Sequence, residues 1–119
     1  MKEIKKLSNE ELINEFINGN HSVGLEIAER DLLLELEVAI GLAKNSITQE
    51  EVDELMKKDS KTLLEELSIS EIEYSDFYGN IVYIQENEND ETFQKISSNL
   101  RSIMTIIRLI LEKRGVEVY

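Results

Sequence analysis

His21 is the only histidine of the chain and the first side chain to consider for catalysis. A lone histidine can act as a general base, but it then needs a nucleophile to deprotonate or a carboxylate to orient its ring. No motif near the predicted turn around His21 supplies either group. The sequence therefore favours a capping or solvent-exposed histidine, and it excludes metal sites that need a histidine pair.

The segment from Glu86 to Glu91 alternates carboxylate and amide side chains, whose oxygens calcium prefers as ligands. A calcium-binding loop, however, needs glycine at its sixth position and a bidentate carboxylate at its twelfth. Counted from Glu86, these positions hold Glu91 and Ser97. The segment fits better as a solvated acidic loop before a helix N-terminus.

Other catalytic signatures are missing from the sequence. Carboxylate pairs such as Glu50 with Glu54 follow from the acidic composition, and no apolar setting around them would raise a pKa for acid catalysis. There is no glycine-rich phosphate loop, and the absence of cysteine removes disulfides and thiolate metal sites. The sequence predicts no catalytic residue, no cofactor and no bound metal.

The best candidate for a binding site is an acidic segment that also carries aromatic side chains. Aromatic rings on a charged surface are typical anchors of protein interfaces. A run of charged residues alone is more often a solvated face. The segment can therefore be either a binding interface or a solvated face. The predicted partner-binding residues are Glu71, Glu73, Tyr74, Asp76, Phe77, Tyr78, Tyr83 and Glu86.

The net charge of -12 is unevenly distributed along the chain. Residues 1–44 hold 9 acids and 5 bases, residues 45–91 hold 14 and 3, and residues 92–119 hold 2 and 5, so the three parts carry -4, -11 and +3. The acidic middle would repel a phosphate backbone and attract a basic protein. Direct nucleic-acid binding is therefore not expected.

Two functions are consistent with these patterns. The first is a non-enzymatic domain that neutralises or regulates a basic, nucleic-acid-handling partner, as immunity proteins, antitoxins and phage inhibitors of host defence do. The second is a helical adaptor or assembly module that self-associates through its last helix. The chain would be a monomer in the first case and a homodimer in the second.

Two predicted helices begin with the same capping motif. Ser8 and Glu11 form a capping box before a helix expected to end at Asn18, where Gly19 can adopt a left-handed conformation. Thr48 and Glu51 form the second capping box. The helix that follows should break at residues 57–60 before a short helix, although a continuous helix to residue 67 is the competing interpretation.

The residues between these starts predict one long helix from about Ser22 to Lys44. From Leu32 onward its apolar side chains cover more than one face, which is typical of a helix in the centre of a bundle. Gly41 would allow another element to approach this helix closely.

Residues 69–86 concentrate β-branched and aromatic side chains around Gly79 and Asn80, which predicts a β-hairpin. The last helix is the strongest signal in the chain, because apolar residues recur without a miss in steps of three and four. They are Phe93, Ile96, Leu100, Ile103, Ile107 and Ile110. The apolar arc widens in the later turns, which favours a buried core helix over a dimer seam.

The predicted fold is mainly α (α+β), a small single-domain bundle of about four to five helices with a short hairpin near residues 69–86. Val116 to Tyr119 would add a short edge strand. The longest apolar-rich stretch is interrupted by Glu35 and Glu37, and no apolar run of signal-peptide length follows the N-terminal lysines. A cytoplasmic protein without membrane contact is therefore expected.

Glu11-Leu12-Ile13, followed by Gly19-Asn20 and a helix, resembles the opening of the second region of bacterial sigma factors. The resemblance covers a short stretch of the chain. The basic and aromatic residues that this family uses on promoter DNA do not follow, so the chain is not assigned to it.

Overall fold

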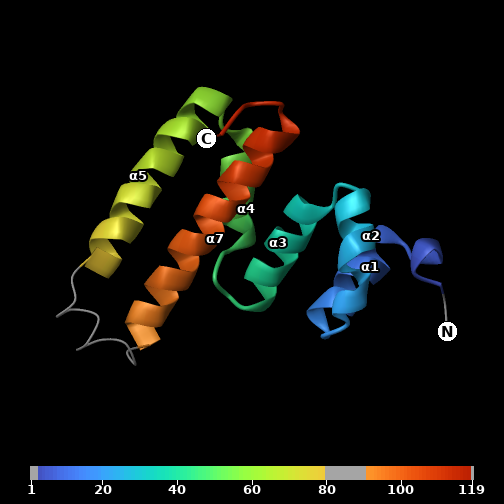
Figure 1. The fold of residues 1–119 in the computed structure, drawn as a ribbon. Helices are drawn as coiled ribbons and strands as arrows, with labels where there is room; N and C mark the ends of the chain where they lie inside the picture. The colour runs from blue at the N-terminus through green and yellow to red at the C-terminus, as the bar shows by residue number, and fades with distance from the viewer. Residues whose placement is uncertain (1–2, 80–90, 119) are drawn as a thin grey trace.

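The computed structural model describes residues 3–79 and 91–118, which Figure 1 draws in colour. These residues form six α-helices and two short 3-10 helices, and no strand lies among them. The α-helices are α1 (Asn9–Ile17), α2 (Gly24–Glu29), α3 (Leu33–Ala43), α4 (Gln49–Lys57), α5 (Ser60–Gly79) and α7 (Glu91–Lys113), and the 3-10 helices are η1 (Ile4–Lys6) and η2 (His21–Val23). The mainly α fold is thus confirmed.

Helix α1 begins and ends as the sequence predicts. The Ser8 hydroxyl accepts from the Glu11 N–H at 3.1 Å, while the Glu11 carboxylate accepts from the Ser8 N–H at 3.0 Å. At the other end Gly19 has a φ of 102°, and the Asn20 N–H donates to the Glu15 carbonyl at 2.9 Å. Both termini therefore satisfy backbone groups that a helix leaves without partners.

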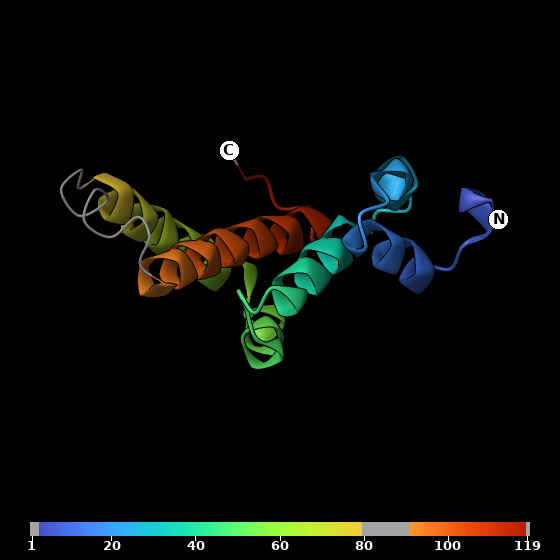
Figure 2. The ribbon, with the colours of Figure 1, turned by 90° about the horizontal axis from the view of Figure 1, so that it is seen from below.

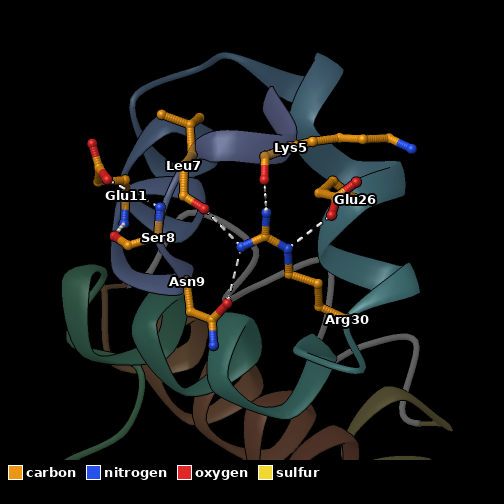
Figure 3. A network of polar contacts seen from close by, with 7 residues as sticks. All are labelled: Lys5, Leu7, Ser8, Asn9, Glu11, Glu26 and Arg30. Atoms are coloured by element: carbon orange, nitrogen blue, oxygen red, sulfur yellow. Dashed lines mark hydrogen bonds and ion pairs between the residues drawn. The ribbon is translucent and has the colours of Figure 1, made fainter. Parts of the chain in front are cut away.

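The long helix expected over residues 22–44 is instead divided into η2, α2 and α3. The division lies at Asp31, whose φ of 58° is left-handed and cannot continue a helix. Aspartate tolerates this conformation better than most residues do. Arg30 precedes this residue, and Figure 3 shows its side chain turned back towards η1 and the start of α1.

The Arg30 guanidinium joins the N-terminal segments. It donates to the carbonyls of Leu7 at 2.7 Å and Lys5 at 3.0 Å, to the Asn9 side chain at 3.1 Å, and to the Glu26 carboxylate at 2.8 Å (Figure 3). Such a fork of donors is specific to arginine, so this position fixes how η1 and α1 lie against α2.

Helix α3 contributes to two separate hydrophobic clusters. Leu34 lies in the cluster that α4, α5 and α7 form, whereas Leu36 lies in the cluster that α1 and α2 form. In Figure 1, α3 stands between the α1–α2 pair and α7. The prediction that this segment lies centrally, with neighbours on several sides, is confirmed.

The close approach expected at Gly41 is made by the loop after α3. A Cβ added to Gly41 would lie 2.5 Å from Ile47 Cγ2, which is closer than carbon atoms pack. The Gly41 carbonyl accepts hydrogen bonds from the Ser46 N–H at 2.9 Å and the Ile47 N–H at 3.4 Å. Glycine at this position therefore lets the loop fold back against the helix.

The predicted break between α4 and α5 is confirmed, because α4 ends at Lys57 and α5 begins at Ser60. The Thr62 N–H donates to Asp59 Oδ1 at 2.7 Å, which caps the start of α5. Hydrogen bonds from the backbone and the side chain of Thr62, together with the positive charge of Arg114, lower the pKa of Asp59 below its ordinary value.

Residues 69–79 belong to α5, so the predicted β-hairpin near residues 69–86 is wrong for this part of the chain, and its remainder lies outside the described residues. The prediction gave too much weight to β-branched and aromatic content. Packing against α7 makes this segment helical. The packed side of the helix carries buried and half-buried side chains at helical spacing, namely Leu63, Leu67, Ser70 and Tyr74.

Helix α7 runs antiparallel to α5 and lies beside it in both views (Figures 1 and 2). Its last turns are buried in the larger cluster, where Ile106, Ile107 and Leu111 are fully enclosed. Gly115 ends the helix with a φ of 74°, as expected. The edge strand predicted from Val116 is wrong for residues 116–118, which are irregular, while Tyr119 lies outside the described residues.

The helices spread out rather than gathering around one centre. The radius of gyration is 16.2 Å, whereas a compact chain of this length would have about 13.5 Å. The molecule measures 50 × 35 × 26 Å along its principal axes, and Figure 2 shows α1 and α2 at the end opposite to α5. None of the described helices combines the length and apolar character needed to span a membrane.

Candidate protein-binding surface

The side of α5 opposite Leu63 and Leu67 is an exposed face of acidic and apolar residues, and Ile69 at its edge also lines a hollow beside α7. Leu63 and Leu67 mark the buried side, and residues half a helical turn away from them must point to solvent. Ile69 and Ile72 are 56% and 61% exposed there. We call this surface the α5 outer face, and its residues are Glu65, Ile69, Ile72, Glu73 and Asp76.

Two of the sequence-predicted site residues, Glu73 and Asp76, lie on the α5 outer face. They share one side of the helix because residues three apart are neighbours on a helical surface. Ile69 and Ile72 were not among the predicted residues. Their signal was present in the sequence as the helical spacing of residues 65, 69, 72 and 76, which the hairpin interpretation concealed.

The other predicted residues do not join this face. Tyr74 is half-buried on the side of the helix that carries Leu67, and it has an interaction partner. Glu71 lies at the flank, where its carboxylate is 3.7 Å from Arg108 Nη2. Phe77 and Tyr78 belong to α5, but their side chains are outside the described part of the structure, as are Tyr83 and Glu86 entirely.

Charge is concentrated on α4 and α5. Residues 48–79 hold ten acidic and three basic residues, a balance of -7, whereas α7 holds two acidic and four basic residues, a balance of +2. The described ion pairs include Lys58 with Glu66 and Lys113 with Glu35. Glu65, Glu73 and Asp76 belong to none of the described pairs, so a cation from outside could approach them.

Two open hollows lie beside α7, on the side where α4 crosses. The first has a volume of about 380 Å³ and lies between α4, α5 and α7, with Leu55, Ile69 and Ile103 among its lining residues. The second, of about 680 Å³, lies between α7 and the loop before α4 and includes Ile96 and Leu100. Glu51 borders both hollows, so they are neighbours along the same helix.

The loop beside the second hollow is held by polar side chains of α7. Asn99 Nδ2 donates to the Ser46 carbonyl at 2.9 Å and to the Glu51 carboxylate at 3.2 Å, and the hydroxyls of Ser46 and Ser102 are 2.9 Å apart. The apolar stripe of α7 in the sequence gives no signal of these polar contacts, which join residues more than forty positions apart. The hydrogen bonds of Asn99 and Ser102 fix the loop before α4 relative to α7, and both elements line the second hollow.

A third hollow, between α3 and α7, carries charges of both signs. Lys44, Lys95 and Arg101 line it together with the carboxylates of Glu37 and Glu91, and its volume is about 750 Å³. Three bases and two acids line this hollow, so it lacks the excess of acids that α4 and α5 carry.

His21 is exposed and packs against Phe16, with the ring centroids 4.7 Å apart. Among the described residues, no three histidine, aspartate or glutamate side chains are grouped closely enough to hold a metal ion. Every buried side-chain nitrogen and oxygen in the described part of the chain has a hydrogen-bond partner.

No family model, no curated protein and no solved structure matches this chain. Its function must therefore be inferred from its own residues, and the features that stand out chemically are the α5 outer face and the hollows beside α7.

Proposed function

We propose that this chain is a non-enzymatic binding domain that neutralises or regulates a basic protein partner, of the kind that handles nucleic acid. Immunity proteins, antitoxins and phage-encoded inhibitors of host defence are proteins of this type. The proposal includes a cytoplasmic location, and the lack of cysteine fits a reducing compartment.

The observation that carries the proposal is the combination of charge and exposed apolar surface on α5. Ile69 and Ile72 are more than half exposed, and they lie among the carboxylates of Glu65, Glu73 and Asp76. Apolar side chains supply affinity when they are buried on binding. Carboxylates around them favour a positively charged partner and accelerate the encounter.

The experiment compares two triple charge reversals against a partner purified from the native host. Glu65→Lys, Glu73→Lys and Asp76→Lys change the α5 outer face. Exposed acids elsewhere provide the matched control, with Glu29, Glu112 and Glu117 changed to lysine. Both variants change the net charge by the same amount, so long-range attraction falls equally in both.

We expect the α5 variant to lose at least about tenfold more affinity than the control in calorimetric titration. Circular dichroism would verify that both variants remain helical. Equal losses in the two variants would mean that only the overall charge matters, and the α5 outer face would then not be the binding surface.

A self-associating adaptor is the second candidate, and the first turns of α7 favour it. Ile96 is 41% exposed and Leu100 is half-buried, so this part of the apolar stripe could pair with another copy. Sedimentation at several protein concentrations separates the two candidates, because a monomer at all concentrations would argue against self-association.

A further inference from the structure

One apolar stripe of α7 passes gradually from the core to the surface. Ile110 and Ile107 are 3% and 0% exposed, Ile103 and Leu100 are half-buried, and Ile96 is 41% exposed. These residues follow one another in steps of three and four, so they lie on the same side of the helix. On this side of the helix, the last turns of α7 are covered by the protein itself, and the earlier turns are covered only in part.

The uncovered part of this stripe forms the floor of the two hollows that share Glu51. Ile103 lies in the hollow between α4 and α5, while Ile96 and Leu100 lie in the hollow next to the loop before α4. We call these two adjoining hollows together the α7 groove; they share the Glu51 side chain, which accepts a hydrogen bond from Asn99 of α7. Figure 2 shows α4 to one side of the α5–α7 pair. Residues of α4, among them Glu54 and Leu55, line the hollow on that side.

The groove is apolar at its floor, and acids outnumber lysines at its edge, where Glu51, Glu54 and Glu66 lie with Lys58 and Lys95. Glu54 and Glu66 line the hollow between α4 and α5, with Lys58 paired to Glu66. Glu54 is exposed and takes part in none of the described ion pairs. A cation next to an apolar side chain would therefore find an anionic partner at this edge.

We infer that the α7 groove binds a basic amphipathic helix of the partner protein, with the apolar side of that helix on Ile96, Leu100 and Ile103 and its basic side chains towards the acids of α4 and α5. This inference rests on the proposed function and specifies the chemistry of the partner. The α5 outer face borders the same groove, because Ile69 belongs to both.

The spacing of the floor residues explains why a helix fits this groove. Ile96 and Ile103 are seven residues apart, which corresponds to about 10 Å along a helix axis. A docked helix can match this length with apolar residues at positions i, i+4 and i+7, the usual anchors of a helix in a groove. An extended peptide would present alternate residues instead and would match the floor less well.

The test uses a fluorescein-labelled synthetic peptide of about 18 leucine and lysine residues, with the leucines at helical spacing. A second peptide has the same composition, but its leucines are scattered so that they gather on no side of a helix. Fluorescence anisotropy measures the binding of each peptide to the full chain. We expect the patterned peptide to bind about tenfold or more tightly than the scattered one.

Three single variants locate the binding site. Ile69→Lys and Ile96→Lys place a charge in the groove, and each should weaken binding of the patterned peptide by about tenfold or more. Leu25→Lys is the matched control, because Leu25 is 72% exposed on α2 and the same charge is added there. All three positions are exposed, so the variants should remain folded, which thermal unfolding would verify.

The outcomes separate the groove from the proposed function. If Ile69→Lys and Ile96→Lys bind the patterned peptide as well as Leu25→Lys does, the groove is not the docking site. In that case, a tenfold loss of affinity for the native partner in the variant with lysine at positions 65, 73 and 76 would still support the proposed function. If that variant loses no more affinity than its control, both the groove and the α5 outer face are rejected as binding surfaces.

A second copy of the chain is the other possible occupant of the groove. If the wild type sediments as a dimer, Ile96→Lys sediments as a monomer, and the two peptides bind equally, the groove is a self-association surface. That result would overturn the inference.

Discussion

Replacing Gly41 with alanine should destabilise the protein, although alanine is the better helix former. Gly41 is buried in the last turn of α3, where the added methyl group would lie 2.5 Å from Ile47 Cγ2 and 3.5 Å from the Ser46 hydroxyl. Ile47 is 3% exposed and cannot turn aside into solvent. The loop cannot retreat either without losing its hydrogen bonds to the Gly41 carbonyl.

Two opposing effects determine the size of the change. Alanine in place of glycine inside a helix stabilises by about 1 kcal/mol, whereas inserting a methyl group into a packed site costs about 1 to 3 kcal/mol. The contact at Gly41 is far inside the usual packing distance, so the upper part of that range applies. We expect a net loss of about 2 kcal/mol in the free energy of unfolding.

The assay is urea unfolding of the wild type, Gly41→Ala, Ile47→Ala and the double variant, followed by circular dichroism. Removing the Ile47 side chain removes the clash, so Gly41→Ala should become neutral or stabilising by up to about 1 kcal/mol in that background. Gly24→Ala is the control, because a Cβ there meets only Phe16, at an ordinary 3.5 Å. If Gly41→Ala stabilises the wild type, the close approach of Ile47 is wrong.

Three further predictions concern polar contacts. Arg30→Ala should lower the free energy of unfolding by about 2 to 4 kcal/mol, because it leaves carbonyls and the Glu26 carboxylate without their donor; urea unfolding would measure this. Asp59→Asn should lower stability at neutral pH, but the difference should disappear in acid. Folding lowers the pKa of Asp59, so its contribution is complete above the ordinary value of about 3.9 and is lost as the pH falls through the folded-state pKa; thermal unfolding from neutral to acidic pH would show it. Arg114→Ala should speed hydrogen exchange at the end of α4, because Arg114 donates to the Met56 carbonyl at 3.1 Å.

Each of these predictions has a contradicting result. Arg30→Lys should restore only part of the stability, since lysine lacks the fork of donors, and full recovery would show that charge alone matters at this position. An Asp59→Asn difference that persists below the pKa of Asp59 would point to packing instead of charge. Unchanged exchange at the end of α4 in Arg114→Ala would mean that water replaces the arginine without cost.

The sequence predicts helix termini well where a local motif satisfies backbone groups. The capping boxes at Ser8 and Thr48 form with the expected partners, and Gly19 and Gly115 both take the left-handed conformation that ends a helix. These features involve residues a few positions apart, so nothing distant in the chain is needed to establish them.

Elements that depend on distant contacts were predicted less well. The left-handed Asp31 divides α2 from α3, and the Arg30 donors that accompany it reach residues more than twenty positions earlier. Residues 69–79 have strand-like content but lie in α5, because Leu67 and Tyr74 follow the spacing set by packing against α7. Propensity is a weak guide when tertiary contacts oppose it.

Which residues of the acidic segment share one face depends on its secondary structure. In a strand, Glu71 and Glu73 would point to the same side because alternate residues share a face. In α5 they are on different sides, and Glu73 instead joins Asp76, Ile69 and Ile72. The acidic character of the segment could be read from composition, whereas the set of residues that act together required the helical register.

The position of α3 between two hydrophobic clusters has a consequence for cooperativity. If α1 and α2 detached, Leu36 would become exposed, and if α4, α5 and α7 detached, Leu34 would become exposed. Each half of this extended molecule therefore loses stability when the other half unfolds, because they share one helix. We expect both halves to melt in a single transition, in which α3 transmits damage at the N-terminal end to the helices that line the α7 groove.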